Sequence, residues 1–150
     1  MIRLFRHIVP ICVALIPYMG YAQIADESGV PVPDIRFETQ KIDIGDTLYR
    51  KNAEYLYRFV FENTGDAPLI VNKVVAACPC IRVEHTTDPL PPGQRDTLYV
   101  FFTPSHASRY SQRLTVFTNS PSSGLQLFAR GNFLKPSEWK ARKQQKTDSQ

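Results

Sequence analysis

Hydrophobic and polar residues alternate most clearly in residues 55–61, which read Tyr-Leu-Tyr-Arg-Phe-Val-Phe. The aromatic residues take every second position, so they would share one side of an extended chain. A period of two residues is typical of a β-strand, whereas a helix repeats every ~3.6 residues. The segment is therefore predicted to be a strand that directs its aromatic rings into a core.

Further segments have the same character and are separated by turn residues, with almost nothing at helical spacing. Including residues 55–61, the predicted strands are residues 34–39, 55–61, 69–75, 81–84, 97–103, 113–118 and 125–130. About seven short strands over roughly a hundred residues are typical of an immunoglobulin-like β-sandwich. The fold is therefore predicted to be all-β.

The core of this sandwich is expected to form by side-chain packing alone. Neither residues 55–61 nor residues 113–118 contain a cysteine that could bridge two sheets, and the single tryptophan, Trp139, lies beyond the last predicted strand. The residues expected to be buried are Phe37, Tyr57, Phe59, Phe61, Leu69, Val71, Leu98, Val100, Phe102, Leu114, Val116, Leu125 and Leu127.

The chain is expected to begin with a secretory signal peptide. Two arginines precede an apolar stretch of about a dozen residues, and small residues ending at Ala22 follow it. A membrane anchor is the alternative, but the stretch is short for a span and is interrupted by prolines. Cleavage near Ala22 would remove Cys12 and export the protein to the periplasm or cell envelope. The predicted parts are the signal peptide (1–22), a flexible leader (23–33), the sandwich (34–134) and a basic tail (135–150).

The formal net charge is +4, from 18 Lys+Arg against 14 Asp+Glu. The signal peptide holds two of these arginines, and the tail alone carries +3, so the sandwich is close to neutral. No nucleic-acid partner is expected, because a basic stripe over the domain is missing. The tail is too short to hold a helix alone, although Ser137 could cap one, and is expected to be disordered. Its charge and Trp139 offer peripheral contact with an anionic membrane surface.

Several motifs follow one another in a fixed order between residues 35 and 133. They are Phe59-Val60-Phe61-Glu62-Asn63-Thr64-Gly65, Pro68-Leu69-Ile70, Cys78-x-Cys80, Pro92-Gly93, Val100-x-Phe102, Val116-x-Thr118-Asn119 and Leu125-x-Leu127-x-x-x-Gly131. Together they resemble the bacterial family of domains of unknown function numbered 1573. The resemblance implies an exported Ig-like sandwich without established activity, similar in architecture to domains that serve as interaction modules. The chain departs from the family at Pro79, where Cys-Gly-Cys is usual, and at Ile44, where the family tends to carry an aromatic residue.

Cys78-Pro79-Cys80 is the one group with potential chemistry, and four interpretations stay open. Residues two apart in an extended chain lie about 6.6 Å apart, near the limit that a disulfide spans. Such a ring removes only about 1.6 kcal/mol of unfolded-state entropy, so a disulfide here would stabilise the fold weakly. The first interpretation is therefore a structural disulfide or two free thiols.

The other interpretations give the cysteine pair an active role. Thiol–disulfide exchange would need a nearby cation, which Arg82 or His85 could supply. Copper(I) or zinc could bind Cys78, Cys80 and His85, although zinc lacks an evident fourth ligand. The last interpretation is pairing with a cysteine of another chain.

The sequence contains no phosphate-binding glycine loop, Gly-x-Ser-x-Gly or His-Glu-x-x-His motif, so an enzyme is the minority interpretation. Alternation instead directs four aromatic residues outward, namely Tyr99, Phe101, Phe117 and Phe128. Phe117 and Phe128 would pair across neighbouring strands or form part of a docking face. The sequence predicts a non-enzymatic module of the cell envelope, without a cofactor, that binds another protein through a face or edge. The alternative is a thiol-based redox or copper(I)-handling protein.

Overall fold

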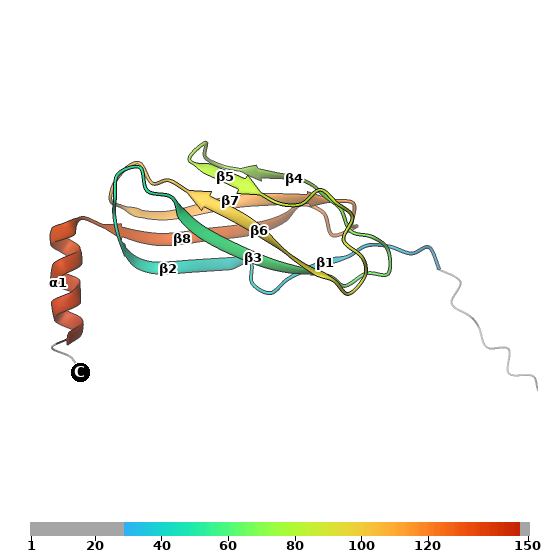
Figure 1. Cartoon of the computed structure of the whole chain (residues 1–150), viewed down its shortest axis with the longest axis horizontal. Helices are drawn as coiled ribbons and strands as arrows, with labels where there is room; N and C mark the ends of the chain where they lie inside the picture. The colour runs from blue at the N-terminus through green and yellow to red at the C-terminus, as the bar shows by residue number, and fades with distance from the viewer. Residues whose placement is uncertain (1–28, 148–150) are drawn as a thin grey trace, which may run out of the picture.

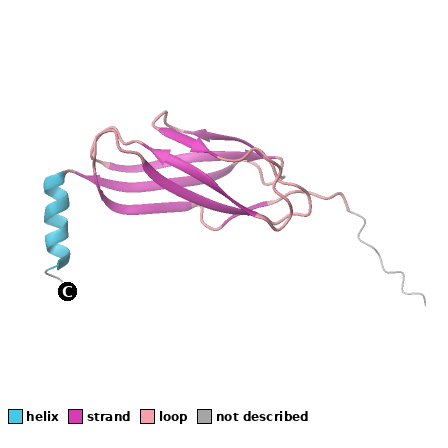
Figure 2. Ribbon diagram, in the orientation of Figure 1, coloured by secondary structure: helices cyan, strands magenta, loops and turns pink. Residues whose placement is uncertain are grey.

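Two four-stranded sheets lie face to face, and helix α1 (Pro136–Thr147) stands at one end of them (Figure 1; Figure 2). The computed structural model describes residues 29–147, so the predicted signal peptide and its cleavage site lie outside the described residues. The elements are β1 (Ile35–Phe37), β2 (Lys41–Leu48), β3 (Tyr55–Asn63), β4 (Val71–Ala76), β5 (Ile81–Glu84), β6 (Arg95–Phe102), β7 (Arg109–Thr118), β8 (Leu125–Leu134) and α1 (Pro136–Thr147). The predicted β-sandwich is confirmed.

The strand order is β1-β3-β6-β5 in one sheet and β2-β8-β7-β4 in the other. All neighbours are antiparallel except β2 and β8, which run parallel. The segment predicted over residues 81–84 coincides with β5, while β7 and β8 each extend four residues beyond their predictions. These extensions bring Arg109 and Asn132 opposite each other at the end of the sheet nearest α1.

Strand β2 was not predicted, and its sequence explains why. Asp43-Ile44-Gly45-Asp46 has the composition of a turn, but in the structure it is an irregular step in the pairing of β2 with β8. Gly45 has φ +66, a conformation that glycine adopts without strain, and its N–H donates to the Asp43 carboxylate at 2.8 Å. These residues thus form a bulge, and β2 continues to Leu48.

The core fills the space between the sheets, and every residue expected in it is buried except Leu125, which is half-buried. Tyr57 lies in this core and donates its hydroxyl to the carbonyl oxygen of Arg130 at 3.0 Å, so β3 is tied to β8 across the sandwich. Burial, and secondarily the charge of Asp43, raises the pKa of Tyr57 from 10.0 to about 12. The phenol therefore stays neutral and keeps its proton for this hydrogen bond.

The two ends of the domain are more ordered than the sequence indicated. The leader is attached from Val32, whose N–H donates to the Asp66 carboxylate at 2.6 Å and whose carbonyl accepts from the Asp66 N–H at 3.1 Å. At the other end, the tail that was expected to be disordered forms α1 over residues 136–147.

Helix α1 begins at a proline in its first turn, where proline costs no hydrogen bond. The cap is not Ser137: the Glu138 carboxylate accepts from the Lys135 N–H at 3.0 Å. Arg142 then joins α1 to the sandwich by an ion pair with Asp46 at 2.5 Å. Contact with β2 and β8 therefore supplies the support that an isolated helix of this length lacks. No helix of residues 29–147 has the length and hydropathy of a membrane span.

Candidate functional site

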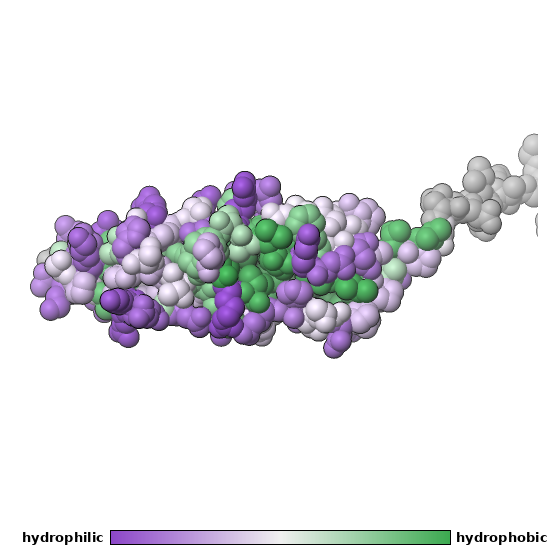
Figure 3. Space-filling model, turned by 90° about the horizontal axis from the view of Figure 1, so that it is seen from above, coloured by the Kyte–Doolittle hydropathy of each residue, from purple (hydrophilic) through white to green (hydrophobic). Residues whose placement is uncertain are grey.

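Cys78 and Cys80 form a disulfide in the short connection between β4 and β5, with their Cα atoms 5.2 Å apart. This connection carries the chain from one sheet to the other. Cys78 and Pro79 line an open groove of about 500 Å³ between the edge strands β4 and β5. Its remaining lining is apolar and consists of Val74, Ala76, Ala77, Ile81 and Val83. Seen from the side where β4 and β5 lie, hydrophobic residues gather over the middle of the molecule (Figure 3).

His85 does not join this pair, so the structure does not assemble the predicted copper or zinc ligands. The two cysteines precede β5 and His85 follows it, which separates Cys80 from His85 by about 16 Å of extended chain. The Nδ1 atom of His85 lies instead 2.8 Å from the carbonyl oxygen of Thr86. Across the described part of the chain, no three His, Cys, Asp or Glu residues are grouped as metal ligands.

Arg82, the predicted cation for a reactive thiol, is also engaged elsewhere. Its guanidinium forms ion pairs with Glu54 and Glu84 and lies 4.0 Å from the centre of the Phe101 ring. The two carboxylates, together with their hydrogen bonds, raise the pKa of Arg82. The arginine therefore holds the outer surface of β5 rather than the cysteine turn.

The four outward aromatic residues do not form one docking face. Tyr99 and Phe101 belong to β6, whereas Phe117 and Phe128 belong to β7 and β8 of the other sheet, so the two pairs lie on opposite sides of the sandwich. The expected pairing of Phe117 with Phe128 is wrong, because Phe128 lies opposite Arg113.

Three of these rings lie beside cations. Lys73 is 5.0 Å from the Phe117 ring centre and Arg130 is 5.8 Å from that of Phe128, as Arg82 is close to Phe101. Such contacts stabilise the sheet surface and leave each ring half-buried. Tyr99 is the most open of the four, at 38% exposure.

The two outer surfaces differ in how their charges are compensated. We call the outer side of the β1-β3-β6-β5 sheet the β3 face; its charged residues are Arg36, Arg58, Glu62, Arg82, Glu84 and Arg95. Glu62 pairs with Arg36 at 3.3 Å and with Arg95 at 3.2 Å, and Arg95 also pairs with Glu38 at 2.9 Å. With the Arg82 pairs, every arginine of this face except Arg58 has a carboxylate partner.

We call the outer side of the other sheet the β8 face; it carries Lys41, Asp43, Lys73, Arg109, Ser111, Arg113, Phe117, Phe128, Arg130 and Asn132. Among the described residues, none of its lysines and arginines forms an ion pair. The β8 face is therefore a cationic surface whose charge the folded domain does not neutralise.

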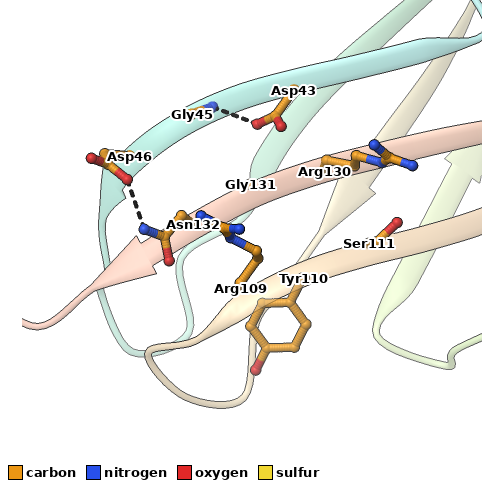
Figure 4. A pocket seen from close by; sticks show the side chains of 9 residues that line it. All are labelled: Asp43, Gly45, Asp46, Arg109, Tyr110, Ser111, Arg130, Gly131 and Asn132. Carbon is orange, nitrogen blue, oxygen red and sulfur yellow. Dashed lines mark hydrogen bonds between the residues drawn. The ribbon is translucent and has the colours of Figure 1, made fainter.

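A cavity of about 490 Å³ lies on the β8 face, between β2 and the ends of β7 and β8. Arg109 and Ser111 come from β7, Arg130 and Asn132 from β8, and the Asp43–Asp46 bulge closes the side formed by β2 (Figure 4). The Asp46 carboxylate accepts from the Asn132 amide at 2.7 Å. This hydrogen bond and the charge of Arg142 hold the pKa of Asp46 below its usual range. The acidic side of the cavity is thus internally bonded, while its arginines are not ion-paired.

This cavity could not be predicted from the sequence. Its residues come from three strands, one of them unpredicted, and only Gly131 is a defined position of the motifs that the chain shares with a known family. One pattern in the sequence does indicate the polar surface around the cavity. Arg109, Ser111 and Arg113 occupy every second position, so these three side chains lie on the same side of a strand.

Comparison with known proteins places the domain in a family. The model of the family described as "Protein of unknown function (DUF1573)" matches residues 35–133, which include all eight strands but the last residue of β8. No functionally curated protein matches the chain.

Solved structures share the architecture at low sequence identity. A protein of unknown function from Porphyromonas gingivalis W83 is 14% identical with a TM-score of 0.56, and the match covers 69% of this chain and 47% of that protein. The PapD-like domain 7 of human CEP192 is 12% identical with a TM-score of 0.57, over 79% of this chain and 99% of that domain. The secreted serine protease VesC from Vibrio cholerae is 14% identical with a TM-score of 0.53, over 70% of this chain and 24% of that protein.

The chain thus spans about half of the Porphyromonas protein and a smaller part of VesC. At these identities the likeness shows a common fold and no common activity.

Proposed function

The chain belongs to the DUF1573 family of proteins of unknown function, and from this premise we propose that it is an exported, non-enzymatic module that binds another protein of the bacterial cell envelope through its β8 face. Export is supported by the signal-peptide pattern of residues 1–22. A role in binding is supported by the β-sandwich fold, which presents two broad, rigid sheet surfaces.

The observation that carries this proposal is the difference in charge compensation between the two outer faces. Both faces carry arginines at alternate strand positions, but among the described residues it is only on the β3 face that these arginines form ion pairs with carboxylates. Cations that a domain leaves uncompensated favour a partner of opposite charge and speed its association. The β8 face is therefore the better candidate for the binding surface.

Site-specific photo-crosslinking in the native bacterium tests this proposal. Phe128→benzoylphenylalanine places the probe on the β8 face, and Tyr99→benzoylphenylalanine is the matched aromatic replacement on the β3 face. We expect a discrete crosslinked species from position 128 in the periplasmic fraction and none from position 99. Equal crosslinking from both positions, or none from position 128, would overturn the proposed binding surface, and recovery of the chain in the cytoplasm would overturn export.

A thiol-based redox function is the second candidate, because the Cys78–Cys80 disulfide lies beside an open groove. Closing so short a ring contributes little to stability, so the bond has a weak structural rationale. Intact mass of the mature protein after alkylation, with metal analysis, separates the two functions. A fully oxidised pair that does not exchange with dithiols supports the binding module, whereas a mixed population of thiols and disulfides, or bound copper, supports the second candidate.

A further inference from the structure

Three arginines form a zigzag row across β7 and β8. The register places Arg109 opposite Asn132, Arg130 opposite Ser111, and Arg113 opposite Phe128. Arg130 on β8 is therefore the diagonal neighbour of both Arg109 and Arg113 on β7. Diagonal neighbours on one side of an antiparallel pair lie about 7–8 Å apart. The row runs along the strands and begins in the cavity of the β8 face.

The acidic residues beside this row are bonded to other groups. The Asp46 carboxylate accepts from Asn132 at 2.7 Å through one oxygen and from Arg142 at 2.5 Å through the other. Asp43 lies opposite Arg130 in the pairing of β2 with β8, but its carboxylate accepts from the Gly45 N–H at 2.8 Å and forms no ion pair with Arg130 or Arg109. The guanidinium groups of the row therefore keep donors that a ligand could use.

We propose that this row binds an extended acidic segment of the partner polypeptide, with carboxylates at alternate positions. The inference rests on the proposed function and specifies the chemistry of the partner. Side chains on one side of an extended segment repeat every ~6.6–6.8 Å, close to the spacing of the arginine row. Carboxylates and guanidinium groups form bidentate, charge-assisted hydrogen bonds, which give the segment a defined register.

The same surface is less suited to an anionic membrane. Peripheral membrane binding combines basic residues with aromatic or aliphatic side chains that enter the lipid. On the β8 face, Phe117 and Phe128 are half-buried beside Lys73 and Arg130, so neither ring projects from the sheet. Val75, on the edge strand β4, is the one large hydrophobic residue among those described on this face that is exposed, at 49%. A single aliphatic side chain offers little insertion into lipid, whereas the arginine row offers spaced donors, which favours a polypeptide.

Binding of a labelled peptide to the mature chain tests the proposal. The probe is an eight-residue peptide of alternating glutamate and threonine; a peptide with the same composition but all glutamates in one block controls for spacing. The triple variant R109Q/R113Q/R130Q removes the row, and R36Q/R58Q/R95Q removes the same charge from the β3 face. We expect the first variant to raise Kd at least about tenfold and the second less than about threefold, with binding weakened by salt. The block peptide should bind more weakly than the alternating one.

The outcomes distinguish this inference from the proposed function. Equal loss of affinity in both triple variants would show attraction by net charge alone and overturn the arginine row. Tighter binding to phosphatidylglycerol vesicles than to the peptide would assign the face to a lipid surface instead. If the wild-type chain does not bind the alternating peptide while position 128 still crosslinks in cells, the acidic segment is wrong and the proposed binding surface remains. Thermal unfolding of both variants confirms that each keeps the fold.

Discussion

The β3 face and the β8 face both carry arginines, but of the two only the β3 face has arginines that form ion pairs within residues 29–147. On both, arginines alternate with inward hydrophobic residues along antiparallel strands. On the β3 face, Glu62 lies between Arg36 and Arg95 and pairs with both. On the β8 face, Arg113 lies opposite Phe128. Arg130 lies between Ser111 and Asp43, yet the Asp43 carboxylate forms no ion pair with Arg130.

Arginines of the β3 face take part in ion pairs within the folded domain, whereas those of the β8 face do not pair with any described residue. Exposed ion pairs contribute little each, but they remove repulsion between neighbouring like charges. The row of the β8 face keeps that repulsion in the free protein, and a bound anion would relieve it. Uncompensated arginines are thus better explained by a partner than by stability.

The largest predicted effect comes from changing the support beneath the β8 face. Gly131 points inward from β8, where an added Cβ would lie 3.0 Å from the Ile44 side chain and 3.1 Å from the Phe133 ring. Gly131→Val should lower the free energy of unfolding by about 1–3 kcal/mol, because the Ile44 side chain and the Phe133 ring would have to shift to admit the branched side chain. Chemical denaturation measures the loss, and the stability of Gly131→Ala should lie between that of the wild-type protein and that of Gly131→Val. Unchanged stability in the valine variant would show that β2 moves freely against β8.

A smaller effect should follow from removing the hydrogen bond that joins the two sheets. Tyr57→Phe leaves the Arg130 carbonyl without its donor and should cost about 1 kcal/mol at pH 7. The pKa of Tyr57 is raised from 10.0 to about 12, so the folded state holds this proton more tightly than the unfolded state does. Wild-type stability should therefore be unaffected well below pH 10 and fall between pH 10 and pH 12.

This pH dependence gives the tyrosine prediction its control. At pH 11 the raised pKa should lower the free energy of unfolding of the wild-type protein by about 1.4 kcal/mol. The Tyr57→Phe variant has no hydroxyl to titrate and should not show this loss. The difference in free energy of unfolding between the wild-type protein and Tyr57→Phe should therefore disappear or change sign at pH 11. A gap that stays constant from pH 7 to pH 11 would contradict the buried, hydrogen-bonded phenol.

The smallest effects compare the two faces directly. Glu62→Gln removes the carboxylate shared by Arg36 and Arg95 and should destabilise the fold by up to about 1 kcal/mol at low salt. Arg113→Gln on the β8 face should leave stability unchanged or raise it slightly, because it removes repulsion and no ion pair. Thermal unfolding at low and high salt measures both. A comparable loss in Arg113→Gln would mean that the β8 face is compensated after all.

The sequence predicted the strands that obey simple alternation and the core that they bury. It missed β2, because Asp43 and Gly45 in a bulge have the same composition as a turn. Disorder was expected for the tail because an isolated helix of this length is unstable, whereas Arg142 and Asp46 hold α1 against the sandwich. Local composition thus predicts strands but not the long-range contacts that fix their irregularities.

The candidate site depended on register, which no single strand reveals. The alternation correctly directed Phe117 and Phe128 outward, but their mutual pairing was wrong because β7 and β8 align Phe128 with Arg113. The arginine row is created by that same alignment. Charge totals concealed it as well, because acidic residues outside the two faces offset the basic residues of the β8 face and leave the whole domain nearly neutral.

The most direct test of the difference between the faces observes the arginines themselves. The side-chain Nε–Hε signals of the mature chain can be followed by NMR during titration with the alternating acidic peptide. Signals of Arg109, Arg113 and Arg130 should shift together and saturate, while those of Arg36, Arg82 and Arg95 stay in place. Shifts distributed equally over both faces, or confined to the β3 face, would contradict the account.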